Sequence, residues 1–204
     1  MYIPAIYKNE NPTEIRNFIN DNGFAILINI TNNKLWGTHI PLILDINENG
    51  KEVLLGHVSK ENPQACSLLN NEEVLVIFSG AHSYISSSWY DHENVPTWNY
   101  LAVHVYGKVN IFNEEKTIIS LKKLVDKYEK KSENPIKIEN LSMKTMFQTR
   151  GIAAFEIEIS SIEAIKKISQ NRDSKNYKSI ISELEKNNDS QSIAMSAIMK
   201  NDIL

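Results

Sequence analysis

The sequence has very little cysteine: Cys66 is the only one among 204 residues. A lone cysteine excludes an internal disulfide and a cluster of thiolate metal ligands. Its neighbours Ala65 and Leu68 are apolar, which predicts a buried structural thiol on a short helix rather than a reactive nucleophile.

Long hydrophobic runs are missing as well. No apolar stretch approaches the roughly 18 residues that a membrane-spanning helix needs. The first residues, MYIPAIYKNENP, lack the basic and then apolar pattern of a signal peptide. We therefore expect a soluble cytoplasmic protein that does not bind a membrane.

An excess of positive charge is also absent, because the net charge is −3 at pH 7 and the isoelectric point is about 6.0. Nucleic-acid binding would then depend on a local basic patch. The motifs G-x-G-x-x-G, G-x-x-x-x-G-K-[ST], H-E-x-x-H and G-x-S-x-G do not occur. His82, His92 and His104 lie near Asp91, but their spacing matches no usual metal site. The sequence thus predicts no metal centre and identifies no catalytic residue.

What the sequence does contain is enough apolar residues, 42% of the chain, for one large domain with a small appendage. Alternating or short apolar runs predict seven strands, with Pro41 marking a bulge or an edge. Tight turns at 31–34 and 47–50 indicate that the first three strands form an antiparallel meander. The predicted strands are 24–30, 35–45, 52–58, 73–78, 101–111, 153–159 and 162–168.

Helix starts are indicated by Asn11-Pro12, by Asn62-Pro63 with an end near Leu69, and by Asn113. A short helix is expected at 141–147. After residue 172 two apolar stripes predict a helical hairpin that packs on the strands or on a second subunit. The helix after Asn113 would bury Ile118, Leu121, Leu124, Val125 and Tyr128, and the hairpin stripes are Tyr177, Ile180, Ile181 and Leu184, then Ile193, Ala194, Ala197 and Ile198. The whole pattern predicts an α+β barrel, with a domain at 1–172 and a helical extension at 173–204.

Aromatic residues gather in the segment 78–107. Its middle, 83–99, shows neither strand nor helix periodicity, although surface loops are usually poor in rings. Two interpretations follow: the loop covers a flat ligand, or it plugs one end of a barrel with its own side chains. The aromatic residues of the segment are Phe78, Tyr84, Trp89, Tyr90, Trp98, Tyr100 and Tyr106.

Three polar clusters are candidate binding elements, although each taken singly is explained by structure alone. Thr38-His39 interrupts an apolar run. His57, Ser59 and Lys60 lie at a strand end just before the helix start at Asn62, an arrangement that suits a phosphate. The third cluster, 166–172, is dense in hydrogen-bond donors and by default is a solvated turn.

Together these blocks resemble the PaiB family of FMN-binding negative transcriptional regulators, whose members adopt the split-barrel flavin-binding fold. The chain differs from the family pattern at two positions: it carries Ala81 and Ser87 where family members usually have proline. The resembling blocks are MYIP at 1–4, THIP at 38–41, GHV at 56–58, NPQ at 62–64, FSGAHSYISSSWY at 78–90, VPTWNYLAVHVYG at 95–107, GIAAFEIEI at 151–159 and KISQNR at 167–172.

The resemblance implies a homodimer of split β-barrels with FMN at the subunit interface. Aromatic rings would cover the isoalloxazine, polar groups would meet its edge, and two sets of donors would hold the phosphate from different subunits. The implied FMN-binding residues are Thr38, His39, His57, Ser59, Lys60, Asn62, Tyr84, Ile85, Ser86, Trp89, Tyr90, Trp98, Lys167, Ser169, Gln170 and Arg172.

The family-level role is repression of transcription. The net charge does not support direct DNA contact, so repression through another regulatory protein fits equally well. The alternative is an FMN-dependent oxidoreductase related to pyridoxamine-phosphate oxidases or flavin reductases, in which the flavin carries the redox chemistry and His39 or His82 donates a proton. Haem binding with a histidine ligand is a third hypothesis.

Overall fold

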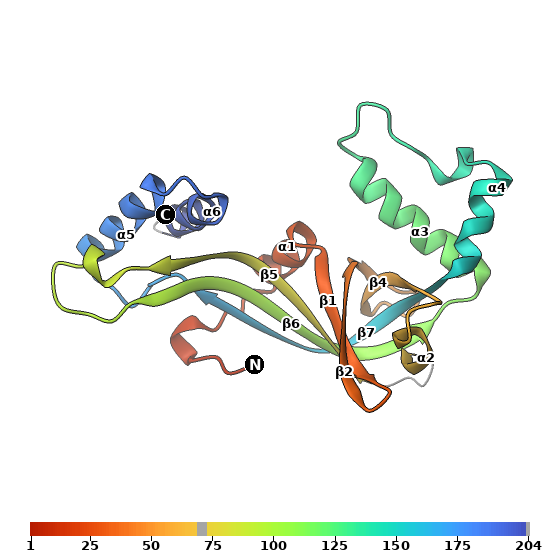
Figure 1. Cartoon of the computed structure of the whole chain (residues 1–204), viewed down its shortest axis with the longest axis horizontal. Helices are drawn as coiled ribbons and strands as arrows, with labels where there is room; N and C mark the ends of the chain where they lie inside the picture. The colour runs from red at the N-terminus through yellow and green to blue at the C-terminus, as the bar shows by residue number, and fades with distance from the viewer. Residues whose placement is uncertain (69–72, 203–204) are drawn as a thin grey trace. The chain divides into compact units, whose positions relative to one another are not determined.

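The computed structural model describes residues 1–68 and 73–202, and its strands form one seven-stranded sheet in the order β2-β1-β5-β6-β7-β4-β3 (Figure 1). The pairings β1–β2, β1–β5, β3–β4 and β4–β7 are antiparallel. The predicted α+β fold is confirmed, and the sheet stays open, with β2 and β3 as its edges. The strands are β1 (Phe24–Thr31), β2 (Lys34–Pro41), β3 (Ile43–Ile46), β4 (Glu52–Ser59), β5 (Glu73–Ile85), β6 (Thr97–Ile111) and β7 (Ile152–Lys167).

The helices begin where the capping residues predict. Asn11 Oδ1 accepts hydrogen bonds from the backbone N–H groups of Thr13 and Glu14 at 3.0 and 3.3 Å, and Asn113 Oδ1 accepts one from Lys116 N at 2.9 Å. No helix in the described ranges is both long and apolar enough to cross a membrane. The helices are α1 (Pro12–Asp21), α2 (Gln64–Leu68), α3 (Glu114–Glu129), α4 (Met143–Met146), α5 (Ser174–Lys186) and α6 (Ser190–Asn201), with 3-10 turns η1 (Ala5–Tyr7), η2 (Ser87–Trp89), η3 (Ile138–Asn140) and η4 (Phe147–Gly151). The predicted end of α2 at Leu69 lies outside the described residues.

The predicted meander is wrong, because the run 35–45 is two strands rather than one. β2 pairs with β1 at one edge of the sheet, and β3 pairs with β4 at the other. Between them Leu42 is fully buried, and its N–H donates to the Gly23 carbonyl at 2.7 Å. Pro41 has no N–H to continue a ladder, so the chain leaves β2 there and crosses to the opposite edge.

Other strands are longer than predicted. β5 runs on to Ile85 and β6 begins at Thr97, so the aromatic loop is 86–96 rather than 83–99. The two predicted strands 153–159 and 162–168 are one strand, β7. Its polar midpoint is accommodated because the Ser160 hydroxyl donates to the Tyr106 carbonyl at 3.0 Å.

The chain divides into two compact units, whose boundaries fall inside α1, β5, β6 and β7. The first unit comprises Met1–Ile15, Ser79–Val103 and Glu163–Leu204, and the second comprises Arg16–Phe78 and His104–Ile162. Each unit therefore contains a part of β5, of β6 and of β7.

The core of the second unit lies on the strands. Leu27, Leu54 and Phe155 are fully buried, whereas Thr117 and Ser120 are the residues that α3 buries. The core face predicted for α3 is therefore only partly formed: four of its residues are half-buried and Tyr128 is exposed. The prediction for Cys66 is wrong, since the thiol is exposed while its neighbours Ala65 and Leu68 turn inward. The half-buried residues are Ile118, Leu121, Leu124 and Val125.

The core of the first unit is formed by α5 and α6 on the ends of the long strands. The predicted α5 stripe is confirmed, with Ile180 and Leu184 fully buried against Ile85 and Ile168. The predicted α6 stripe is wrong for Ile193, Ala194 and Ala197, which are exposed, while Ile198 does pack against this core. α6 instead buries Ser192, Met195, Ser196 and Met199, because two flexible methionines fill the core and Ser192 hydrogen-bonds the Ser83 hydroxyl at 2.9 Å.

The close approach of β6 and β7 at Gly107 gives a stability prediction. A Cβ at this position would lie 2.4 Å from the Glu158 carbonyl oxygen and 2.7 Å from Ile157 Cγ2. Gly107→Ala should therefore lower the free energy of unfolding by about 2–3 kcal/mol, since backbone must move to relieve the clash. Urea unfolding followed by circular dichroism measures the change.

The matched control is Gly151→Ala, where a Cβ would meet nothing within 4 Å. This variant should stay within about 0.5 kcal/mol of the parent chain or be slightly more stable. Equal stability of the two variants would show that β6 and β7 do not approach as closely as described.

Candidate functional site

Four of the candidate residues lie where β4 ends and the chain turns toward α2. Lys60 N–H donates to the Gly151 carbonyl at 2.9 Å, Asn62 N–H to the Ser59 carbonyl at 3.0 Å, and Glu61 N–H to Ser59 Oγ at 3.2 Å. These bonds fix the backbone of a tight turn, 59–62. α2 has only five residues, which is too short for a substantial helix dipole. A ligand at this place would therefore be bound by the side chains and backbone groups of the turn itself.

Thr38 joins this turn from the far end of β2. Asn62 Nδ2 donates to Thr38 Oγ1 at 2.9 Å, while Asn62 Oδ1 accepts from Gln64 N–H at 3.0 Å. The neighbouring residue His39 lies on the opposite face of the strand, as strand alternation requires, and its exposed ring stacks on Phe24 with centroids 6.0 Å apart. The structure thus brings Thr38 to the turn, and His39 lies on the other face of β2.

Behind the turn is a buried amide pair that sequence reasoning missed. Gln64 is fully buried, and its Nε2 donates to Asn29 Oδ1 at 2.9 Å and to the Leu27 carbonyl at 3.2 Å. Asn29 also accepts from Thr31 Oγ1 at 3.1 Å. The signal was a polar residue inside the apolar run FAILINI. The pair ties α2 to β1 and so holds Asn62 in place.

The charge state of this cluster follows from burial. Burial lowers the pKa of His57 below the usual value for imidazole, so the ring is neutral at pH 7 and serves as a neutral donor or acceptor. Lys60 is exposed and forms no ion pair among the described residues. It is therefore the cation that this turn offers to an anion.

In the first unit, strand alternation separates the candidates at the end of β5. Ile85 is fully buried beneath α5 and α6, whereas Tyr84 is 46% exposed on the other face. There the Tyr84 and Trp98 rings meet edge to face at 6.0 Å, and the His82 ring lies 6.2 Å from Trp98. Trp98 is 53% exposed, so this aromatic cluster, His82, Tyr84 and Trp98, presents uncovered ring surface.

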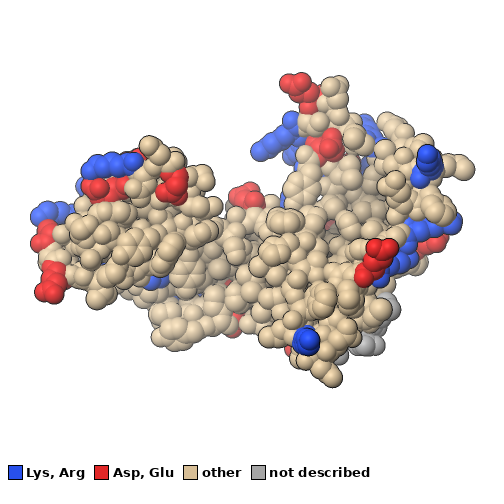
Figure 2. Space-filling view, in the orientation of Figure 1, with Lys and Arg blue, Asp and Glu red and all other residues tan. Residues whose placement is uncertain are grey.

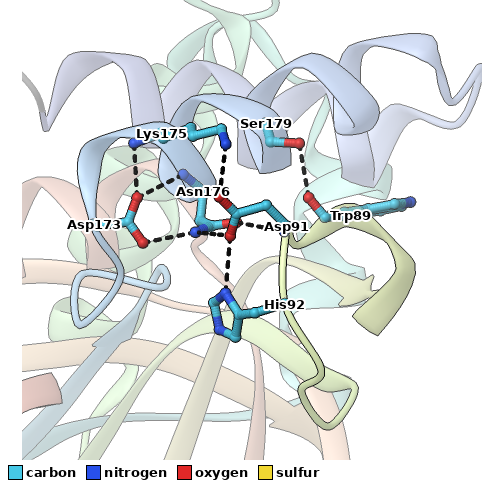
Figure 3. A network of polar contacts seen from close by, with 7 residues as sticks. All are labelled: Trp89, Asp91, His92, Asp173, Lys175, Asn176 and Ser179. Carbon is cyan, nitrogen blue, oxygen red and sulfur yellow. Dashed lines mark hydrogen bonds and ion pairs between the residues drawn. The ribbon is translucent and has the colours of Figure 1, made fainter.

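Trp89 and Tyr90 have a different environment. Tyr90 belongs to the core of the first unit, with the Arg172 guanidinium 4.9 Å from its ring centroid, and Trp89 packs against the same core. The loop that carries them is fixed to α5, because the Ser179 hydroxyl donates to the Trp89 carbonyl at 2.8 Å (Figure 3). These two rings therefore anchor the loop, while the polar groups of Ser86 cap η2 through a 3.2 Å bond from Ser88 N–H.

Asp91 completes the attachment of the loop. Its carboxylate accepts hydrogen bonds from Lys175 Nζ at 2.7 Å and Asn176 Nδ2 at 3.0 Å, and contacts His92 Nδ1 at 2.9 Å (Figure 3). Lys175 first, then His92 and Asn176, lower the pKa of Asp91 well below its usual range. The Asp91 carboxylate is therefore ionised at physiological pH, and its contacts with Lys175 and Asn176 hold the aromatic loop to α5.

The last group of candidates lies in the turn that follows β7. Ser169 has φ 62° and is buried, with its hydroxyl donating to Asn99 Oδ1 at 3.0 Å. Gln170 Nε2 donates to the Lys166 carbonyl at 2.6 Å, and Lys167 Nζ donates to Thr97 Oγ1 at 2.5 Å. Burial, followed by the nearby Arg172 cation, lowers the pKa of Lys167. Ser169 and Gln170 shape the turn, and Lys167 and Arg172 carry its charge.

The structure thus assembles the sixteen predicted residues into two groups, one in each unit. Thr38, Ser59, Lys60 and Asn62 form a turn-centred cluster in the second unit, together with His57 and with His39 on the other face of β2. The remaining ten residues lie in the first unit, on the ends of β5 and β6, the aromatic loop and the turn after β7.

Comparisons with known proteins agree on one family. A family model described as "Putative FMN-binding domain" matches residues 1–161. The Bacillus subtilis protein named protease synthase and sporulation protein PAI 2 is 38% identical over 201 residues, which cover 98% of this chain and 97% of that protein.

Solved structures share the fold. The FAD and haem binding protein from Mycobacterium smegmatis superimposes with a TM-score of 0.64 at 12% identity, over 84% of this chain and 78% of that one. The flavocytochrome Anf3 from Azotobacter vinelandii gives 0.64 at 13% identity, over 87% and 78%. These two likenesses show the split-barrel fold, and the family model and the Bacillus relative show that this chain belongs to the FMN-binding PaiB family.

Proposed function

We propose that this FMN-binding protein of the PaiB type acts as a homodimer that represses transcription, with the flavin held at the subunit interface. FMN is its cofactor, as the family shows. The observation that supports the residue assignment is the turn 59–62, in which the Asn62 amide bonds Thr38. The same turn carries the Ser59 hydroxyl and the Lys60 ammonium group, which forms no ion pair with any residue that the structure describes.

The donor set of this turn fits a phosphate. Lys60 supplies the positive charge, and charge-assisted hydrogen bonds are about twice as strong as neutral ones. The Ser59 hydroxyl already accepts from Glu61 N–H, so its own proton is free to donate. Asn62 uses one amide hydrogen on Thr38 and has a second to offer. The neutral His57 ring adds a donor without adding charge.

The exposed aromatic cluster of the first unit fits an isoalloxazine ring. Isoalloxazine is flat and apolar with a polar edge, and the uncovered rings of Tyr84 and Trp98 offer it a stacking surface. Trp89 and Tyr90 support this surface by holding the loop, and Ile85 and Ser86 contribute backbone groups. In the proposed dimer Lys167 and Arg172 approach the partner subunit's phosphate, and Ser169 and Gln170 position them. Bound FMN supplies redox chemistry.

The surface charge argues that repression is exerted through a protein partner. Basic and acidic side chains lie next to one another on the visible face (Figure 2). Ion pairs are common among the described residues, as between Lys122 and Glu139 at 2.5 Å and between Lys186 and Glu183 at 2.5 Å. With a net charge of −3, the visible face offers DNA no single-sign field.

A second candidate function is an FMN-dependent oxidoreductase. The exposed His82 ring beside Trp98 favours it, because a proton donor next to a flavin-stacking ring is what such chemistry uses. Bleaching of bound flavin by NADH or NADPH would distinguish this function from a regulator that only binds the cofactor.

Replacing Lys60 tests the phosphate assignment. Lys60→Ala should weaken FMN binding roughly tenfold, the effect of losing one charged hydrogen bond, in a fluorescence-quenching titration. Lys34→Ala removes another exposed lysine of the second unit and should leave the affinity unchanged. An unaltered affinity in Lys60→Ala would place the phosphate elsewhere, while weaker binding in both variants would show a general charge effect.

Direct DNA binding is tested by gel shift of a random-sequence duplex across salt concentrations. We expect no shift, even at low salt, because sequence-independent binding depends on phosphate neutralisation by basic side chains. A shift that weakens steeply with added salt would contradict the proposed repression through a protein partner.

A further inference from the structure

The second unit contains a cavity that the proposed FMN site leaves unexplained. It has a volume of about 410 Å³ and lies among α2, the start of α3, η4 and the first residues of β7. Only Lys60, of the sixteen residues assigned to FMN, lines it. Its size is within the range of small-molecule sites, roughly 300–1,000 Å³.

The cavity wall is mostly apolar. Ile111 and Phe112 contribute from the end of β6, Ile118 from α3, and Ile152 and Ala153 from β7. Such a wall stabilises an apolar molecular body by removing its surface from water.

Two cations stand at the cavity beside this apolar wall. Lys60 and Arg150 both line it and are exposed, and the Lys60 N–H bond to the Gly151 carbonyl holds their two segments together at 2.9 Å. Within residues 1–68 and 73–202 neither cation has a carboxylate partner; Arg150 instead lies 4.7 Å from the Phe147 ring centroid. Glu114 is the one acidic residue of the lining, so the cavity carries a net charge of one positive unit.

We propose that this cavity binds a small organic monoanion with an apolar body, of the class of medium-chain or aromatic carboxylates. The body lies on the apolar wall and the carboxylate is held by Arg150, whose planar fork matches carboxylate geometry. Lys60 adds a second positive charge to the site. The site is distinct from that of FMN, and the two share only the lysine.

Cys66 provides a reporter for the test, because it is exposed, lines the cavity and is the only cysteine of the chain. The rate of its alkylation by N-ethylmaleimide, which is uncharged, is measured on the full chain with increasing octanoate. We expect octanoate to slow alkylation several-fold and the uncharged octanamide to need roughly tenfold higher concentration for the same protection. Equal protection by the two compounds would overturn the proposal, since the cations would then play no part.

Two variants test the role of the cations, and added FMN tests whether the cavity is separate from the flavin site. Arg150→Ala should raise the octanoate concentration needed for protection roughly tenfold, while Lys144→Ala, which removes an exposed cation that does not line the cavity, should not change it. Saturating FMN should leave octanoate protection in place but raise the octanoate concentration it needs, because the two ligands share Lys60. If FMN alone protects Cys66 and octanoate adds nothing, the cavity belongs to the flavin site and the separate ligand is disproved, whatever the fate of the proposed regulator.

Discussion

The corner at Leu42 is the constraint on which the second unit depends. The chain leaves β2 at Pro41 and enters β3 at the opposite edge of the sheet, and Leu42 between them is fully buried. Gly56 makes this possible: a Cβ there would lie 2.4 Å from Leu42 Cδ2 and 3.5 Å from the Pro41 carbonyl oxygen. Because β2 and β4 meet at this corner, Thr38 arrives beside Asn62, and the donors of the 59–62 turn gather in one place.

Local signals in the sequence predicted local structure well. Asn11 and Asn113 were found because a cap bonds backbone groups only two or three residues away, and the α5 stripe was found because Ile180 and Leu184 repeat at helical spacing. The corner at Leu42 and the joining of two runs into β7 were missed, since strand pairing depends on partners far along the chain. The buried face of α6 was missed because small and apolar residues occur on every side of this helix, so its sequence does not show which side is buried. The side that carries Met195 and Met199 is the one that fills the core.

In the candidate site, too, local features were predicted from the sequence and features that depend on strand geometry were not. Chemistry that belongs to one turn, such as Ser59, Lys60 and Asn62, was predicted from residue types alone. Strand alternation then separates neighbours that the sequence treated as equivalent: Thr38 from His39, and Tyr84 from Ile85. Within the aromatic loop Trp89 and Tyr90 pack against the core of the first unit, whereas Trp98 lies on β6 and stays exposed. That the segment covers a flat ligand stays a prediction. Because hydrogen bonds between Asp91 and α5 already hold the loop, it does not have to order itself when a ligand binds.

The central claim is that this chain holds a planar, phosphorylated flavin, and its most direct test is the visible absorption spectrum of the protein purified without added cofactor. The account predicts flavin bands that stay with the protein through desalting, or a preparation that gains them, and thermal stability, when FMN is supplied. A protein that stays colourless and unstabilised after incubation with FMN would contradict it.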